Sequence, residues 1–244
     1  MANAYQHFLI TRFNIGYTNP EKRDKNRISV NTKDYLHKRL ILFDNITRQS
    51  VRTQSKQDFT WFVGFDNQTP ENLKEILQYI DPNVKWIEAN TNEEFLKIIN
   101  EYVTAEHLLT TRIDSDDEMR PFFIEWLHNA VNKYCLQKEP TPALFTFPKG
   151  LVTDLTTRDY MIYTDINNSF VSLLEHIDPP AAPDMVYRYP YPTITEHYPT
   201  TIITVKDEYG TELCMWNIIS HSCNLHTDYH TLLRRFKNTT VGNK

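Results

Sequence analysis

The stretch that decides the fold is HLLTTRIDSDDE, residues 107–118. Its first five residues form an apolar run of the kind that favours a buried strand. The residues after it deliver Asp114, Asp116, Asp117 and Glu118 into a turn. A packed protein seldom gathers acids so densely without a cation to offset them. The stretch therefore predicts a metal and diphosphate site at the end of a strand.

Strands alternate with helices along the chain up to about residue 140. The expected strands cover residues 6–15, 59–65, 84–89 and 107–111, and the expected helices cover 32–51, 70–80, 91–102 and 120–136. Thr32 and Thr91 stand where helix caps are needed, and Pro70 stands at a helix start. This order predicts an α/β fold with a Rossmann-like, mixed but mostly parallel central sheet flanked by helices. In such sheets, ligands bind beyond the carboxyl ends of the strands.

The pattern changes after residue 140, which indicates a smaller C-terminal subregion. Strands are expected at residues 143–147, 160–164 and 201–205, a short helix at 169–176, and a proline-rich segment at 179–199. A chain of 244 residues with 40% hydrophobic content can bury the core of one large domain. We therefore expect a single domain over residues 1–244.

The composition narrows the partners and the compartment. A formal net charge of -5 provides no global attraction to nucleic acid, so none is expected as a partner. No signal peptide and no membrane-length apolar run is visible, so we expect a cytoplasmic chain without a transmembrane segment. The tail, residues 228–244, combines apolar with basic residues. Two interpretations remain: it packs on its own domain, or it makes a peripheral contact with an anionic membrane.

The acidic run has a specific chemical meaning if the strand continues through it. Asp114 and Asp116 are two residues apart, so an extended backbone points both carboxylates to one face. Magnesium and manganese take one or two such carboxylates together with phosphate oxygens. One alternative is a solvated acidic turn that caps the helix starting near Arg120. A calcium loop is disfavoured because Met119 stands where its sharp turn needs glycine.

The acidic run resembles the DXD motif of GT-A glycosyltransferases. Five blocks in this order are similar to the putative rhamnosyltransferase family within that fold: residues 8–14, 59–66, 112–117, 169–175 and 216–224. The resemblance covers roughly residues 6–226. It implies transfer of a sugar from a UDP-, dTDP- or GDP-linked donor, with Mn²⁺ or Mg²⁺ bridging the diphosphate. It also implies a nucleotide-sugar half over about residues 1–120, an acceptor half over about 121–230, and a tail.

The same resemblance implies a donor site at the ends of the first, second and fourth strands. Its residues are Thr11, Arg12, Phe13, Asp66, Arg112, Asp114 and Ser115. The first three would lie beside the nucleotide, Asp66 near the base or ribose, and Arg112 near the phosphates or the sugar. The alternatives are a surface salt bridge for Arg12, core packing for Phe13, a turn position for Asp66 and an ion pair with neighbouring acids for Arg112.

The resemblance also implies the metal ligands and a catalytic base. Asp116 is the expected metal ligand, Asp114 reaches the ribose or the metal through water, and His221 is a third metal ligand or a structural histidine. Ser222 stands where the family usually has glycine. An inverting transferase needs a base, and the first candidate is Glu175. The other candidate bases are Asp165, Asp207 and Glu196, and the alternative for Glu175 is an exposed acid at a helix end.

The expected function is a metal-dependent, inverting glycosyltransferase that moves a sugar such as rhamnose to a glycan or lipid-linked acceptor. Two other functions remain open from the sequence. One is a metal-dependent nucleotidyltransferase or phosphohydrolase on a related sheet. The other is a carbohydrate-binding domain that has the fold without the activity.

Overall fold

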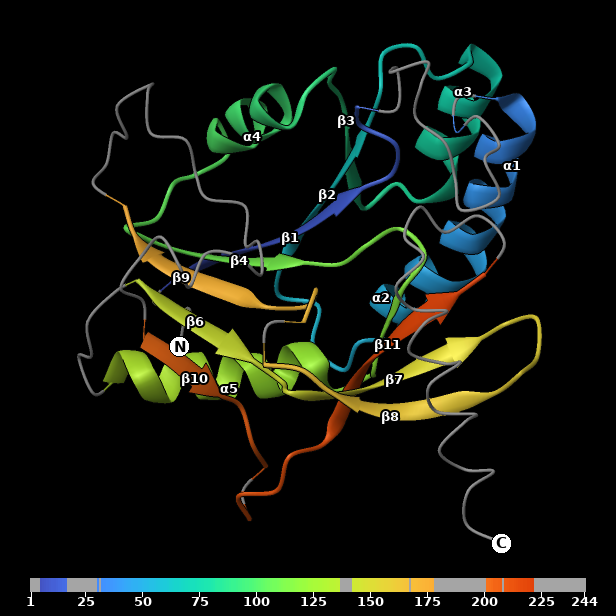
Figure 1. Ribbon diagram of the computed structural model, residues 1–244. Helices are drawn as coiled ribbons and strands as arrows, with labels where there is room; N and C mark the ends of the chain where they lie inside the picture. Colours follow the sequence, from blue (N-terminus) through green and yellow to red (C-terminus); the bar gives the residue numbers. More distant parts are fainter. Residues whose placement is uncertain are drawn as a thin grey trace, which may run out of the picture.

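The computed structural model describes residues 5–16, 30, 32–136, 142–166, 168–177, 201–207 and 209–221 (Figure 1). These residues form two sheets. The strand order is β10-β6-β9-β4-β1-β2-β3 in the larger sheet and β5-β11-β7-β8 in the smaller one. The proline-rich segment, Glu196, Ser222 and the tail lie outside the described residues.

One half of the larger sheet is parallel, as the sequence predicts. It consists of β1 (Gln6–Arg12), β2 (Thr60–Phe65), β3 (Val84–Glu88) and β4 (His107–Arg112). β1 pairs with both β2 and β4, and β2 pairs with β3. The carboxyl ends of β1 and β4 therefore lie side by side, where ligands bind in such sheets (Figure 1).

The helices between these strands begin close to the predicted positions. They are α1 (Lys33–Leu42), which continues through a π-helical turn (Phe43–Thr47) into α2 (Arg48–Arg52), then α3 (Glu71–Ile80), α4 (Asn92–Asn100) and α5 (Phe123–Leu136). Thr32 Oγ1 accepts a hydrogen bond from the backbone N–H of Tyr35 at 3.3 Å, and Thr91 Oγ1 accepts one from that of Glu94 at 3.1 Å. Both caps are confirmed.

Helices cover both faces of the larger sheet. On one face, Phe95 and Ile99 of α4 belong to the same buried cluster as Phe8 and Phe62. On the other face, Phe123 and Leu127 of α5 join a second cluster that includes Leu109 and Phe145. Figure 1 shows α4 and α5 on opposite sides of the sheet. The predicted α/β fold class is confirmed. Among the described residues, no helix is long and apolar enough to cross a membrane.

The predicted helix over residues 169–176 is wrong, because the structure has the strand β9 (Ser172–His176) there. β9 runs antiparallel to both β4 and β6 (Ala143–Thr146) and joins them into one sheet. Ser172, Leu173 and Leu174 are all buried. A strand covered on both faces shows no alternation of polar and apolar residues, and so short an apolar run looks the same in a helix.

The smaller sheet contains two strands that the sequence pattern did not reveal. They are β7 (Lys149–Asp154) and β11 (Cys214–Ser220), which pair in parallel. β8 (Tyr160–Thr164) and β10 (Thr201–Thr204) agree with expectation. β5 (Glu118–Met119) pairs antiparallel with β11, so this sheet begins where the acidic run ends.

Trp216 is the centre of packing in the smaller sheet. Its ring is fully buried and stacks on Phe170 with a centroid separation of 5.5 Å and an interplanar angle of 13°. Its indole N–H donates a hydrogen bond to the carbonyl of Phe147 at 2.7 Å. Gly150 lies directly against the ring, where a Cβ would overlap its atoms. This packing fixes β11, whose far end leads to His221.

Candidate active site

The acidic turn, residues 113–117, directly follows β4 and is held against the end of β1. The N–H of Ile113 donates a hydrogen bond to the carbonyl of Ile10 at 3.1 Å, which continues the β1–β4 pairing by one residue. The N–H of Asp117 then donates one to the carbonyl of Asp114 at 3.2 Å and closes the turn. The turn therefore lies at the edge where a bound ligand is expected.

Arg112 and Asp114 form an ion pair at the start of the turn. The Nη2 atom of Arg112 lies 2.8 Å from each carboxylate oxygen of Asp114, and Nε lies 3.1 Å from Oδ1. The Asp114 side chain is 29% exposed, against 10% for Arg112. The ion pair expected as the alternative for Arg112 is thus present, and it leaves one side of the Asp114 carboxylate open to solvent.

Asp116 is the centre of the cluster and joins three distant parts of the chain. His221 Nε2, at the end of β11, lies 2.8 Å from Oδ2 of Asp116. The guanidinium of Arg39, on α1, donates hydrogen bonds to the same oxygen and to the hydroxyl of Ser115. Arg39, Asp116 and His221 are 5%, 7% and 4% exposed. The structure therefore brings Asp116 and His221 together, as the resemblance implied.

The pKa values of the two buried aspartates shift in opposite directions. Burial alone would raise the pKa of Asp116, but the charges and hydrogen bonds of Arg39 and His221 outweigh it and lower the pKa below the usual value. Burial raises the pKa of Asp117 well above the usual value, and the charges of Asp116 and Asp114 add to that effect. Of the two, Asp116 is the carboxylate whose surroundings favour the ionised form.

Asp117 has a structural role in the turn. Its Oδ1 accepts a hydrogen bond from the backbone N–H of Ile219 at 3.0 Å. Two residues before Ile219, the Asn217 side-chain amide donates a hydrogen bond to Glu118 Oε2 at 3.0 Å. The acids that follow Asp116 thus attach the turn to β11 and hold His221 beside Asp116.

The charges of the cluster largely cancel within it. Arg112 pairs with Asp114, and Arg39 pairs with Asp116. Two of the four acids that looked unmatched in the sequence, Asp114 and Asp116, are therefore matched by arginines. Arg39 was missed because it lies 77 residues from Asp116, and an arginine in an amphipathic helix usually indicates a solvated face.

A π-helical turn between α1 and α2 brings residues on both sides of it into contact with the acidic turn. Arg39 lies before it, and Thr47 is its last residue. Thr47 Oγ1 donates a hydrogen bond to the carbonyl of Asp114 at 3.4 Å. Between them, Phe43 packs its ring edge-on against Phe13, with centroids 5.9 Å apart. Because a π turn holds more residues than an α turn, it rotates the following residues, and Arg39 and Thr47 both reach the acidic turn.

Asp66 lies fully buried at the carboxyl end of β2. Its Oδ1 accepts a hydrogen bond from the N–H of Gln68 at 3.0 Å. Its own N–H donates to Asn14 Oδ1 at 3.1 Å, and the Asn14 amide donates to Thr69 Oγ1 at 2.8 Å. Among the described residues, Asp66 Oδ2 has no hydrogen-bond partner. A buried carboxylate oxygen of this kind is suited to a ligand hydroxyl or N–H.

The three predicted donor residues at the end of β1 have different surroundings. Thr11 is fully buried and accepts a hydrogen bond from Trp61 Nε1 at 3.0 Å. Phe13 is 1% exposed and packs in the core, as its alternative stated. Arg12 Nη1 lies 3.4 Å from Asn92 Oδ1 on α4. Of the three, the partly buried Arg12 is the side chain suited to a ligand at this edge.

Glu175 is not brought to this cluster. It pairs with Leu108, near the start of β4, whereas the acidic turn follows the end of that strand. Four residues of strand, roughly 13 Å, separate that position from Arg112. The other candidates differ again. Asp165 is half-buried and follows β8. Asp207 accepts hydrogen bonds from the N–H groups of Tyr209 and Thr211 in a turn before β11.

Asp116 and His221 have the spacing of two ligands of one cation. Adjacent ligands of an octahedral Mg²⁺ or Mn²⁺ lie about 3 Å apart, and the separation here is 2.8 Å. Among the described residues, no group of three or more His, Cys, Asp or Glu side chains is suited to a metal ion. The remaining positions of such a shell would have to come from substrate and water.

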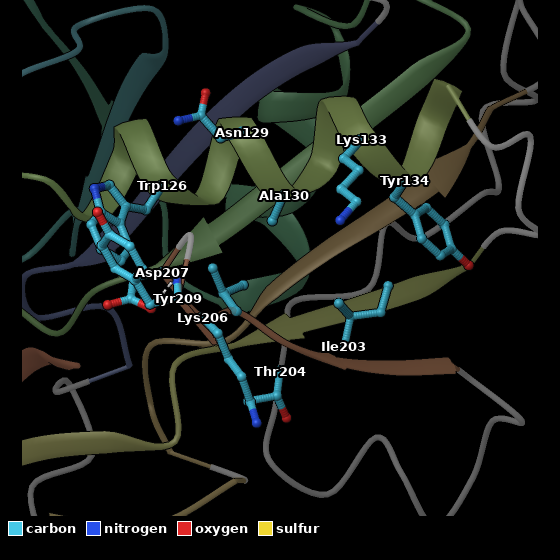
Figure 2. A pocket seen from close by; sticks show the side chains of 11 residues that line it. Trp126, Asn129, Ala130, Lys133, Tyr134, Ile203, Thr204, Lys206, Asp207 and Tyr209 are labelled. Carbon is cyan, nitrogen blue, oxygen red and sulfur yellow. Dashed lines mark hydrogen bonds between the residues drawn. The ribbon is translucent and has the colours of Figure 1, made fainter. Parts of the chain in front are cut away.

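A cavity of about 750 Å³ lies apart from this cluster, between α5 and β10 (Figure 2). Trp126, Lys133 and Tyr134 line it from α5, and Ile203 and Asp207 line it from β10 and the residues after it. No described lining residue belongs to the acidic turn or to β11. The cavity is therefore distinct from the site built around Asp116.

The mixed, mostly parallel sheet, with an acidic turn at the carboxyl end of β4, agrees with the Rossmann-like fold that the sequence predicts. The sequence pattern of the family described as "Putative rhamnosyl transferase" matches residues 6–210, and the chain belongs to that family. A search of the curated proteins gives no match.

Two solved structures illustrate what the fold is similar to. TarS 1-349 from S. aureus is 11% identical, with a TM-score of 0.44 over 88% of this chain and 60% of that one. This chain thus spans less than two thirds of that structure's length. A "putative nucleotide-diphospho-sugar transferase" from Desulfovibrio desulfuricans G20 is 10% identical, with a TM-score of 0.43 over 98% of this chain and 90% of that one.

Proposed function

We propose that the protein transfers a sugar, with rhamnose as the first candidate, from a nucleotide diphosphate to a glycan or lipid-linked acceptor. The transfer depends on a divalent cation and inverts the configuration of the sugar. The observation that carries the proposal is the Asp116–His221 pair at the carboxyl end of β4. The donor is UDP-, dTDP- or GDP-linked.

The charges of the site support a cation that enters with the donor. Asp114 and Asp116 are already balanced by Arg112 and Arg39. A diphosphate adds two negative charges, which one divalent cation offsets. Asp116 and His221 would hold the cation, and the diphosphate and water would complete its shell. A neutral imidazole ligand favours Mn²⁺ over Mg²⁺. When bound, the cation supplies positive charge to the departing diphosphate.

The surrounding residues support the orientation of the donor. Asp66 offers its buried Oδ2 to the base or ribose, and Arg12 lies at the end of the neighbouring strand. Asp114 is exposed on the side away from Arg112, where it can accept a hydrogen bond from the ribose. The proposal keeps nucleotide binding in about residues 1–120 and acceptor binding in about residues 121–230, as the resemblance implies.

In the proposed reaction, the acceptor oxygen forms a bond to the anomeric carbon while the bond from that carbon to the diphosphate breaks. The electron pair of the broken bond remains on the diphosphate, and the acceptor proton passes to a base. Glu175 is not proposed as this base because it lies near the start of β4. No described residue is assigned to the role.

A thermal-shift screen of UDP-, dTDP- and GDP-linked sugars, with and without Mn²⁺, tests the proposal. A ligand that binds the native state raises the unfolding temperature. We expect a shift with one donor that requires Mn²⁺ and disappears in Asp116→Asn, while Glu175→Gln retains it. If no nucleotide diphosphate or nucleotide sugar shifts the protein, with or without the metal, the proposal fails.

The reaction products separate a transferase from the other enzyme class. Slow donor hydrolysis by a transferase yields free sugar and a nucleoside diphosphate. A phosphohydrolase would instead release a nucleoside monophosphate and a sugar phosphate, and a nucleotidyltransferase supplied with pyrophosphate would release a nucleoside triphosphate and a sugar phosphate. Chromatography of the nucleotides after incubation with Mn²⁺ distinguishes the two, with Asp116→Asn as the inactive control.

A further inference from the structure

We propose that Arg39 is a positioning residue that occupies Asp116 in the donor-free protein, so that the divalent cation binds tightly only together with the nucleoside diphosphate. The inference rests on the proposed metal and diphosphate site and adds a residue that the sequence pattern did not indicate. Its basis is the position of the Arg39 guanidinium on the oxygen that also contacts His221.

The geometry places a guanidinium and an imidazole on the same carboxylate oxygen. Arg39 Nη1 and His221 Nε2 both contact Oδ2 of Asp116. A metal ligated by Asp116 and His221 would lie between these two side chains, on the side of Oδ2 that faces the imidazole. The guanidinium and the metal therefore compete electrostatically for the Asp116 carboxylate, and each weakens the binding of the other to it.

The second contact of the guanidinium fixes its position. Arg39 Nη2 donates a hydrogen bond to Ser115 Oγ, while Nη1 holds Asp116. The planar fork of arginine thus spans two consecutive residues of the acidic turn, which a lysine could not do with the same geometry. Ser115 Oγ itself lies 3.5 Å from the carbonyl of Phe13 at the end of β1. The charge is held at the edge where the diphosphate is proposed to bind.

The same helix is attached to the acidic turn at a second point, through Thr47 and the carbonyl of Asp114. Arg39 is 5% exposed, so its charge cannot leave for bulk solvent without cost. When a cation takes Asp116, the guanidinium needs another anion close by. The incoming diphosphate supplies one, in a form that arginine binds well. Metal and nucleotide therefore favour each other's binding.

Calorimetric titration of the full chain tests the inference with Mn²⁺ alone, with UDP, dTDP or GDP alone, and with both together. In the wild type we expect weak binding of Mn²⁺ alone and a large gain when the nucleotide that binds is present. In Arg39→Met the competitor is gone, so Mn²⁺ alone should bind about tenfold more tightly, within the usual range of coupling between sites. The gain from the nucleotide should shrink by about the same tenfold factor, while the part that comes from direct ligation of the metal by the diphosphate remains.

Two variants separate this positioning role from a structural one. Arg39→Lys retains the charge but loses the fork, so its Mn²⁺ affinity should lie between those of the wild type and Arg39→Met. It also provides the test if Arg39→Met does not fold. Arg52→Met removes a guanidinium from the end of the same helical stretch, where Arg52 pairs with Asp81, and should leave both titrations unchanged.

The titrations distinguish a failure of this inference from a failure of the proposed function. If folded Arg39→Met binds Mn²⁺ alone no more tightly than the wild type, while the nucleotide still enhances binding, the inference is wrong and the metal site stands. If Mn²⁺ binds no variant even with nucleotide, both are wrong. If the nucleotide binds the wild type equally with and without Mn²⁺, the metal-dependent function fails first.

Discussion

His221 Nε2 lies 2.8 Å from Oδ2 of Asp116, although 105 residues separate the two positions. The contact depends on a chain of attachments between the acidic turn and β11. Asp117 accepts the N–H of Ile219, and Met119 pairs with Trp216. The site therefore belongs to both sheets at once, and it forms only when the smaller sheet has folded against the larger one.

Removing the Asp116 carboxylate should destabilise the fold, because it leaves the buried Arg39 guanidinium without its charge partner. We expect Asp116→Ala to lower the free energy of unfolding by about 3 to 5 kcal/mol. Denaturant titration measures this. Asp44→Ala, which breaks the more exposed pair with Arg48, should cost only about 0.5 kcal/mol.

The double variant Arg39→Met/Asp116→Ala tests the origin of that loss. Because it removes both charges, it should recover at least half of the lost free energy of unfolding, although it binds no Mn²⁺. Equal destabilisation in the single and double variants would show that the loss does not arise from the unpaired guanidinium.

Glu175→Gln should leave the transfer rate within about threefold of the wild type, since a general base contributes at least a hundredfold. Glu175 pairs with Leu108 at the end of β4 opposite to the acidic turn. A steady-state rate comparison with Asp116→Asn, at matched folded fractions, checks this. A hundredfold loss in Glu175→Gln, with donor binding intact, would restore it as the base.

Acid should destabilise the protein through a buried histidine pair. His7 Nδ1 lies 2.7 Å from His128 Nε2, and His7 Nε2 lies 2.9 Å from Thr111 Oγ1. Burial lowers the pKa of His7 well below 6.5, and burial followed by the charge of Lys56 lowers that of His128 to about 4. The folded protein thus keeps both rings neutral at a pH where the unfolded chain is protonated.

The sign of the effect follows from this difference. The two histidines do not lower the free energy of unfolding above pH 6.5. As the pH drops from 6.5 towards 4, each of them lowers it by about 1.4 kcal/mol per pH unit. His128→Gln retains a polar partner for His7 without titrating, so the slope of unfolding free energy against pH should decrease by about 1.4 kcal/mol per unit. An unchanged slope in His128→Gln contradicts the assignment.

Gly150→Ala should disturb the packing that fixes β11. A Cβ at this position overlaps the Trp216 ring, and overpacking of this kind costs about 1 to 3 kcal/mol. Because β11 leads to His221, Mn²⁺ affinity in the presence of nucleotide should fall as well. Lys149→Ala, beside it on the same strand, should change neither quantity appreciably. Wild-type stability in Gly150→Ala would show that Trp216 has room to move.

The parallel part of the fold is predictable because each of its elements has a local signature. β1, β2 and β4 are apolar runs, and Thr32 and Thr91 occupy the caps that their residue types indicate. β9 is not predictable in this way. Its residues Ser172 to Leu174 are all buried between β4 and β6, so neither helical nor strand periodicity is visible.

The site is only partly visible in the sequence for a similar reason. The acidic turn shows its chemistry locally because its acids are adjacent in the chain. Arg39 has no such signal, since its partners lie 76 and 77 residues away and only the docking of α1 brings them together. Thr11 and Phe13 show the converse: their positions suggested the donor, but both side chains are buried in the core.

The most direct test of the central claim is pulsed electron paramagnetic resonance of Mn²⁺ bound to the protein with the nucleoside diphosphate that binds. If Asp116 and His221 hold the cation, the spectrum will show coupling to a directly bonded imidazole nitrogen, and His221→Gln will abolish it. Bound Mn²⁺ with no nitrogen coupling, or with coupling that His221→Gln leaves unchanged, would contradict the account.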